Sequence, residues 1–194
     1  MNEPLSLDEA VVTDPESASS PAGLSALLLH FRISQFLYHE AQLLDEHRFK
    51  DWLSLFDEQV SYRVPVQRNR LRRQRVLDPT AKPAIEMAHY DDDRPLLELR
   101  IAQLESGQNW AEEPRSRSRH FITNIRVETA AEPDLYKVRS NFIVTRNRGE
   151  TEEDIWAGER YDELRAYGAQ FRIASRLAIL DQNVVLSKNL SVFF

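Results

Sequence analysis

Cysteine is absent from this chain of 194 residues. Its absence excludes disulfide bonds, thiolate zinc sites, cysteine nucleophiles and any iron–sulfur cluster held by this chain alone. Glycine is scarce, and its five positions match neither G-x-G-x-x-G nor G-x-x-x-x-G-K-[ST]. Dinucleotide-binding and P-loop phosphate sites are therefore excluded, because their tight turns need glycine at fixed offsets.

Positive charge and long apolar runs are also in short supply. Lys and Arg number 25 against 31 Asp and Glu, which gives a formal net charge of −6. A net-acidic chain is a poor general binder of nucleic acid, because phosphate contacts require a basic face. No apolar run approaches the ~20 residues that span a bilayer. Residues 1–22 contain neither Lys nor Arg and lack the apolar centre of a signal peptide. We therefore expect a cytoplasmic protein that binds no membrane.

The length suits a single domain, which at this size buries ~70% of the surface of its unfolded chain. Residues 1–22 hold three prolines, several serines and five acidic residues. This segment has too few apolar residues for their burial to offset the conformational entropy that is lost on folding. We expect residues 1–22 to form a flexible arm and residues 23–194 to form one folded domain.

Three segments in the first half show the spacing of helices. Residues 24–45 are predicted to form a helix, because mostly apolar side chains recur at i, i+3 and i+4. The face that we expect to be buried carries Leu24, Leu27, Leu28, Phe31, Gln35 and Tyr38. A short helix is predicted over 48–57. A third helix should begin near Asp93, which can cap it, with Pro95 in the first turn.

From residue 60 onward the period changes to two, which indicates strands. The first, 60–66, contains Pro65, which marks an edge strand or the end of the strand. Four longer strands are predicted at 118–128, 135–147, 153–164 and 170–180, and one face of the first of these should carry Phe121, Thr123, Ile125 and Val127. Their short connections predict antiparallel pairing. Helices followed by such strands indicate the α+β class, with helices packed on one face of a curved sheet.

Two groups of residues suggest chemistry. His89 and Asp91, followed by His120, resemble the two-histidine, one-carboxylate pattern of non-haem iron. However, His89 falls in a loop rich in proline and acid, where neighbouring carboxylates could serve equally, so a solvated acidic loop is the favoured interpretation. A second pair, His39 and Asp45, could act in proton transfer with Tyr38 and Tyr62 nearby. Six residues apart on a helix, the pair does not share a face, so a structural role is again favoured.

Arginine is the most frequent cation, at 21 of the 25 basic residues. It is concentrated in residues 68–75 and at Arg115, Arg117 and Arg119. Its planar fork suits contacts between subunits, although a solvated surface is an equal alternative. The chain ends in apolar residues that should be buried, either in its own sheet or against another subunit: Leu186, Leu190, Val192, Phe193 and Phe194.

Four longer stretches stand out together: FLYHEAQLLDEHRFKDWLSLFDEQVSYRVPVQRNR (36–70), WAEEPRSRSRHFITNIRV (110–127), NFIVTRNRGETEEDIWAGERYDELR (141–165) and LSKNLSVFF (186–194). In order and without large gaps, they resemble the β, or small, subunit of aromatic-ring-hydroxylating dioxygenases, in the branch of the biphenyl, toluene and cumene dioxygenases. The likeness covers about residues 30–194 and is weakest at residues 76–92.

This resemblance implies a cone of the nuclear-transport-factor or scytalone-dehydratase kind, within the cystatin-like folds. It implies an α3β3 hexamer whose α subunit holds a Rieske [2Fe–2S] cluster and a mononuclear iron. That subunit adds both atoms of O2 to an aromatic hydrocarbon, giving a cis-dihydrodiol, with electrons that come from NADH through a reductase and a ferredoxin. The β subunit is expected to be structural, with no catalytic, cofactor-binding or metal-binding residue and no nucleic-acid partner.

We therefore expect copies of this chain to form a trimer that contacts the α subunits. Subunit contacts are predicted at seven residues: Trp110, Arg115, Arg117, Arg119, Arg148, Phe193 and Phe194. The alternative is a stand-alone isomerase or dehydratase of the same cone fold, with His39 or His120 beside a carboxylate in an open pocket. A pocket without such a pair would indicate a ligand-binding module, and a filled cone would favour the structural subunit.

Overall fold

The computed structural model describes residues 21–66, 87–106, 115–182, 184–185, 187 and 190–194. Within these residues lie three helices and a six-stranded sheet. The helices are α2 (Pro21–Asp45), α3 (Phe49–Leu53) and α4 (Arg94–Glu105). The strands are β1 (Phe56–Pro65), β2 (Ala88–Asp92), β3 (Arg117–Thr129), β4 (Leu135–Arg148), β5 (Glu152–Tyr167) and β6 (Gln170–Leu180). The predicted α+β class is confirmed.

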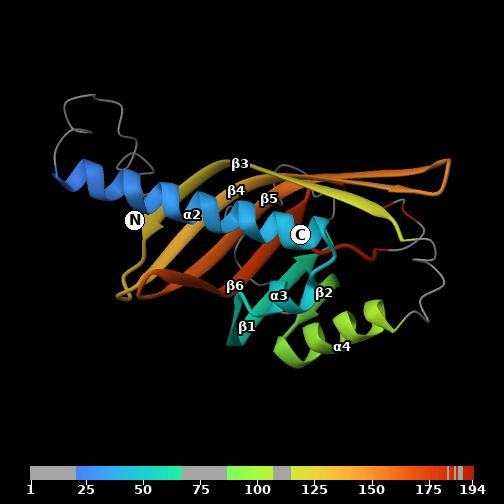
Figure 1. Cartoon of the computed structure of the whole chain (residues 1–194), viewed down its shortest axis with the longest axis horizontal. Coiled ribbons are helices and arrows are strands. Elements are labelled where there is room, and N and C mark those ends of the chain that lie inside the picture. Colours follow the sequence, from blue (N-terminus) through green and yellow to red (C-terminus); the bar gives the residue numbers. More distant parts are fainter. Residues whose placement is uncertain (1–20, 67–86, 107–114, 183, 186, 188–189) are drawn as a thin grey trace, which may run out of the picture.

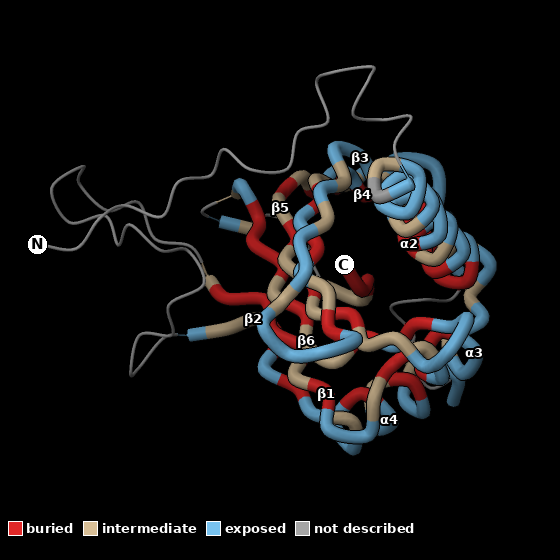
Figure 2. The backbone as a smooth tube through the Cα atoms, turned by 90° about the vertical axis from the view of Figure 1, so that its left-hand side faces the viewer, coloured by how far each residue is buried: buried red, intermediate tan, exposed pale blue. Residues whose placement is uncertain are grey.

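The strands follow the order β2-β1-β6-β5-β4-β3 in one curved sheet (Figure 1). Neighbours from β6 to β3 pair antiparallel as predicted, whereas β1 and β6 run parallel. The three tight turns between the long strands contain Asp134, Gly149 and Gly168, all with φ near 60°. Glycine adopts this left-handed conformation without steric cost, and Asp tolerates it. The helices lie on one side of the sheet, and the C-terminus lies between the sheet and α2 (Figure 2).

The buried face of α2 differs from the predicted one. Four apolar residues of the expected stripe and Tyr38 are between 47% and 63% exposed: Leu24, Leu27, Leu28, Phe31 and Tyr38. The face turned toward the sheet instead carries Ile33, Leu37, Glu40 and Leu44. Glu40 is buried because its cationic partners, Arg160 and Arg176, reach it from strands more than a hundred residues later in the sequence. The exposed stripe is thus an apolar surface of the domain.

One strand changes face part-way along. Asn124 of β3 has φ of 54°, and the register with β4 shifts between Thr123 and Arg126. This β-bulge leaves Phe121 exposed on the outer face and turns Ile125 inward, so the predicted single face of four residues was wrong.

Element boundaries agree in part with the sequence. The Asp93 carboxylate accepts a hydrogen bond from the Leu96 amide at 3.1 Å and caps α4, as predicted. The predicted helix at 48–57 is shorter because the chain enters β1 at Phe56, and His89, which was expected in a loop, lies on β2. Of the predicted arm, residues 1–20 lie outside the described residues and the last two begin α2. None of the described helices is long and apolar enough to cross a membrane.

Candidate functional site

Four charged side chains meet in the interior between α2 and the sheet. They are Glu40 of α2, Arg160 and Asp162 of β5, and Arg176 of β6, each at most 2% exposed. Arg176 donates from Nη2 to Glu40 Oε2 at 2.8 Å, and from Nε and Nη2 to the two Asp162 oxygens at 2.7 and 3.0 Å. Arg160 lies within 3.4 Å of Glu40 and 3.2 Å of Asp162. Two cations and two carboxylates give the cluster no net charge.

The electrostatics of this cluster keep Glu40 and Arg176 ionised. Burial by itself raises the pKa of Glu40, but the guanidinium groups of Arg176 and Arg160 outweigh it and lower that pKa from 4.5 to about 2. Burial likewise opposes the charge of Arg176, yet Asp162 and Glu40 raise its pKa above the ordinary arginine value. A general acid or base works best when its pKa is near the working pH. The cluster is therefore suited to holding elements together rather than to transferring protons.

The C-terminal segment enters the interior and covers this cluster. The Phe193 ring lies 4.4 Å from that of Trp52, and the Phe194 ring 5.5 Å from that of Phe142. Tyr62 Oη donates to the Phe194 carbonyl oxygen at 3.1 Å and accepts from the Phe194 amide at 2.7 Å. The same carbonyl accepts from Arg176 at 3.1 Å. These bonds and ring contacts fix the segment inside the cone.

This placement corrects the expectation for Phe193 and Phe194. They are 3% and 1% exposed, because they fill the core of their own chain. Their apolar surface is therefore not available to another subunit.

Asp45 at the end of α2 has a histidine partner, but it is His120 of β3 rather than His39. The Asp45 Oδ1 atom lies 2.7 Å from His120 Nδ1 and accepts from the His120 amide at 3.0 Å. The other ring nitrogen, Nε2, lies 3.0 Å from the Phe193 carbonyl oxygen. Both ring nitrogens thus lie within hydrogen-bonding distance of oxygen atoms of the protein itself. The pair joins α2, β3 and the C-terminal segment.

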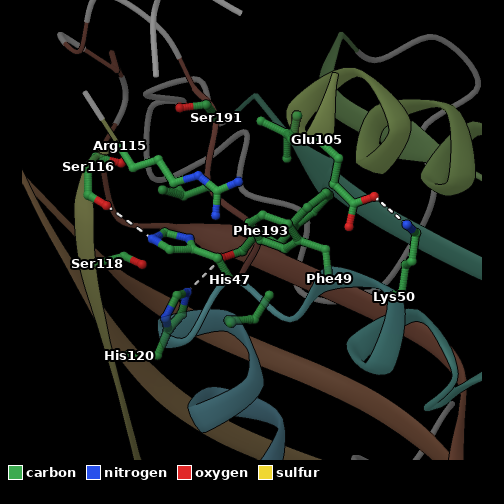
Figure 3. A pocket seen from close by; sticks show the side chains of 13 residues that line it. His47, Phe49, Lys50, Glu105, Arg115, Ser116, Ser118, His120, Ser191 and Phe193 are labelled. Atoms are coloured by element: carbon green, nitrogen blue, oxygen red, sulfur yellow. Dashed lines mark hydrogen bonds and ion pairs between the residues drawn. The ribbon is translucent and has the colours of Figure 1, made fainter. Parts of the chain in front are cut away.

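An open cavity of about 420 Å³ lies beside this pair (Figure 3). Its floor includes Phe49 and Phe193, and the side chain of Arg115 extends across it. On its walls, His47 Nε2 lies 3.1 Å from the Ser116 carbonyl oxygen, and Lys50 pairs with Glu105 at 2.8 Å. His120 borders the cavity, yet neither of its nitrogens is free to meet a bound molecule.

The other predicted site residues are not brought together. His89 and Asp91 lie on β2 with Tyr90 buried between them, and among the described residues no three His, Asp or Glu side chains could hold a metal ion. His39 is exposed on α2. Trp110 lies outside the described residues.

The arginines that were predicted to contact other subunits differ in their exposure and in their ion pairs. Arg117 is exposed on the outer face of β3, as Arg115 is at the cavity. Arg119 pairs with Asp45 at 3.2 Å, and Arg148 pairs with Glu152 across the β4–β5 turn at 3.7 Å. The sequence reasoning missed the buried cluster, although Arg160 and Asp162 share the strand face of Trp156 and so carried a signal for it.

Comparison with known proteins decides the family. Residues 39–187 match the family described as the ring hydroxylating beta subunit. The chain is also 40% identical over 178 residues to the β subunit of biphenyl 2,3-dioxygenase from Rhodococcus jostii, covering 91% of this chain and 94% of the relative. This chain belongs to the β subunits of ring-hydroxylating dioxygenases. It is therefore a component of an aromatic-ring dioxygenase, and the family implies an α subunit as its partner.

Solved structures agree on the fold of this β subunit. A naphthalene 1,2-dioxygenase with indole in its active site matches with a TM-score of 0.76 at 24% identity, over 92% of this chain and 97% of that one. The β subunit of benzoate 1,2-dioxygenase from Burkholderia mallei matches at 0.57 and 23%, over 84% and 91%. A protein from Novosphingobium aromaticivorans assigned as a scytalone dehydratase matches at 0.58 and 14%, over 81% and 87%. The cone fold inferred from the resemblance is confirmed.

Proposed function

We propose that this chain is a structural, non-catalytic β subunit. In this proposal three copies support three α subunits in an α3β3 hexamer. The α subunits hold the iron centres and add O2 to an aromatic hydrocarbon with electrons derived from NADH. The observation that carries the proposal is the filled cone, in which the C-terminal segment occupies the interior and engages His120.

The residues of this chain do not fit the metal centres that the family uses. A Rieske cluster takes two cysteines and two histidines, and this chain contains no cysteine. Among the described residues, no cluster of His, Asp and Glu offers an iron site. The buried carboxylates among the described residues are already bound to arginine: Glu40 and Asp162 to Arg176, and Asp92 to Arg100. We therefore assign both iron centres to the partner subunit.

One observation favours the alternative of a stand-alone acid–base enzyme: His120 and Asp45 form a hydrogen-bonded pair beside an open cavity. A substrate could reach His120 Nε2 only after the Phe193 carbonyl left it. That departure would break the bonds of Phe194 to Tyr62 and Arg176 and would expose two buried rings. Such exposure costs roughly 1.5–3 kcal/mol for each large apolar side chain. In this proposal the His120–Asp45 pair therefore has a structural role, in which it connects α2, β3 and the C-terminal segment.

Co-expression with the α subunit of the same enzyme tests this function. We expect the two chains to purify in a one-to-one ratio with the mass of an α3β3 complex in native mass spectrometry. Iron should follow the larger chain when the subunits are separated. The purified β chain alone should show no turnover of aromatic hydrocarbons. Turnover by the β chain alone, or iron bound to it in stoichiometric amount, would contradict the proposal.

A further inference from the structure

We propose that the outer face of the sheet, turned away from the helices, is the surface on which a second copy of this chain docks. The orientation is head to tail, so that β3 and β4 of one copy lie against β5 of the next. This inference rests on the proposed function, in which copies of the β subunit assemble together. The inference specifies which surface the copies use and why that surface binds a second copy of itself.

The centre of this outer face is apolar. Phe121 of β3 lies directly opposite Ile143 of β4, which in turn lies opposite Ala157 of β5. Ile155 is diagonal to Ile143, two residues away on the same face of β5. Phe121, Ile143 and Ile155 are 53%, 43% and 57% exposed. Contiguous exposed apolar side chains across three strands are typical of an association surface.

Charge divides this face into two sides. The outward residues with positive charge lie on β3 and β4: Arg117, Arg119, Arg126, Lys137 and Arg139. The outward acidic residues lie mainly on β5: Glu153, Glu159 and Glu163. Within β3 to β5 two charges depart from this division, Glu128 and Arg165. Arg165 is already paired with Glu132 within the chain, and Arg172 of β6 lies opposite Arg165 on the same face. The apolar centre thus spans three strands, of which β3 and β4 carry mainly basic outward residues and β5 mainly acidic ones.

Some of these oppositely charged side chains are too far apart to form ion pairs within one chain. Arg117, Asn147 and Glu153 share one row across β3, β4 and β5. Arg117 and Glu153 are therefore two strand spacings apart, or roughly 10 Å. Among the described residues neither of them makes an ion pair. In a head-to-tail arrangement, Arg117 of one copy can meet Glu153 of the next.

The second apolar surface, the exposed stripe of α2, lacks this property. Its members are Leu24, Leu27, Leu28, Phe31, Gln35 and Tyr38, none of which is charged. A surface that carries its own electrostatic complement can bind a second copy of itself, and repeating a head-to-tail contact closes a ring when the rotation allows. The sheet face has that complement and the α2 stripe does not, so we assign self-association to the sheet.

Sedimentation of the isolated full-length chain provides the test. Ile143→Glu places a carboxylate at the apolar centre, and we expect it to weaken self-association at least ~30-fold, as for an interface hot spot. Leu28→Glu on the α2 stripe is the matched control and should leave self-association unchanged. Circular dichroism melts of both variants establish that they remain folded. If Ile143→Glu associates as tightly as the unchanged chain, the inference is overturned.

Charge reversal provides a second readout that a merely unfolded variant would not give. Arg117→Glu and Glu153→Arg should each weaken self-association, since each places like charges together at the contact. The double variant restores opposite charges between neighbouring copies and should recover at least half of the lost binding free energy. Failure of the double variant to recover any of it would contradict the head-to-tail arrangement.

The outcomes separate this inference from the proposed function. A chain that stays monomeric at high concentration yet forms a complex with the α subunit would overturn the inference and leave the role of β subunit standing. Loss of α binding in Ile143→Glu, with self-association intact, would assign the sheet face to the α subunit and also overturn the inference. Failure of the unchanged chain to bind an α subunit would instead contradict the proposed function.

Discussion

Replacing Arg176 by leucine should lower the free energy of unfolding by about 3–5 kcal/mol, the cost of removing one partner from a buried ion pair. Arg176 is the only residue of the cluster that hydrogen-bonds to both carboxylates. Its loss leaves Glu40 and Asp162 with Arg160 alone and so buries an uncompensated negative charge. The measurement is urea-induced unfolding of the isolated chain at pH 7, followed by circular dichroism.

An exposed arginine supplies the control for this substitution. Arg139 pairs with Glu159 at 2.8 Å, and the two side chains are 48% and 37% exposed. Arg139→Leu should cost no more than about 1 kcal/mol, since solvent screens exposed ion pairs. A double variant, Glu40→Gln with Arg176→Leu, should be more stable than the sum of the two single changes predicts, because it removes both charges. Equal costs for Arg176→Leu and Arg139→Leu would show that the cluster does not stabilise the cone.

Replacing Phe193 by alanine should destabilise the chain by about 3–5 kcal/mol, the usual cost of truncating a buried aromatic side chain. Its ring contacts Trp52 at 4.4 Å, and its removal leaves a cavity among four aromatic rings, those of Phe49, Trp52, Tyr62 and Tyr90. Thermal unfolding of the isolated chain measures the loss.

Phe31→Ala makes the same chemical change on the exposed stripe of α2, where the ring is 60% exposed. It should alter stability by no more than about 0.5 kcal/mol. If Phe193→Ala cost as little as Phe31→Ala, the C-terminal segment would not be an integral part of the core. The interior would then be accessible, and the acid–base alternative would regain its main requirement.

The sequence predicts the strands of this fold better than it predicts its interior. Period-two patterns and short polar turns identify β3 to β6 to within a few residues, because alternation and turn chemistry are local properties. The point in β3 at which the buried face changes cannot be predicted from the sequence, because it depends on the left-handed conformation of a single residue, Asn124. The burial of Glu40 depends on Arg160 and Arg176, which reach it only after the sheet has formed.

The same limit applies to the candidate site. His120 and Asp45 were each noticed in the sequence but with other partners, because 75 residues separate them and only the packing of α2 along β3 joins them. Of the apolar C-terminal residues expected to be buried, Val192, Phe193 and Phe194 are buried, Leu190 is partly buried, and Leu186 lies outside the described residues. Which subunit buries them could not be predicted, since hydropathy measures the need for burial and not the location of the partner.

We propose that this chain has a structural role and that the α subunit carries out the reaction. The most direct test is turnover by the complex of the α subunit with the β variant Asp45→Asn, His120→Gln, normalised to the iron content of fully assembled complex. Loss of a general acid–base group costs about 10²–10⁴-fold in rate. We expect turnover within about twofold of the unchanged complex, because neither ring nitrogen of His120 is available to a substrate. A loss of a hundredfold or more in a complex of unchanged mass and iron content would contradict the account.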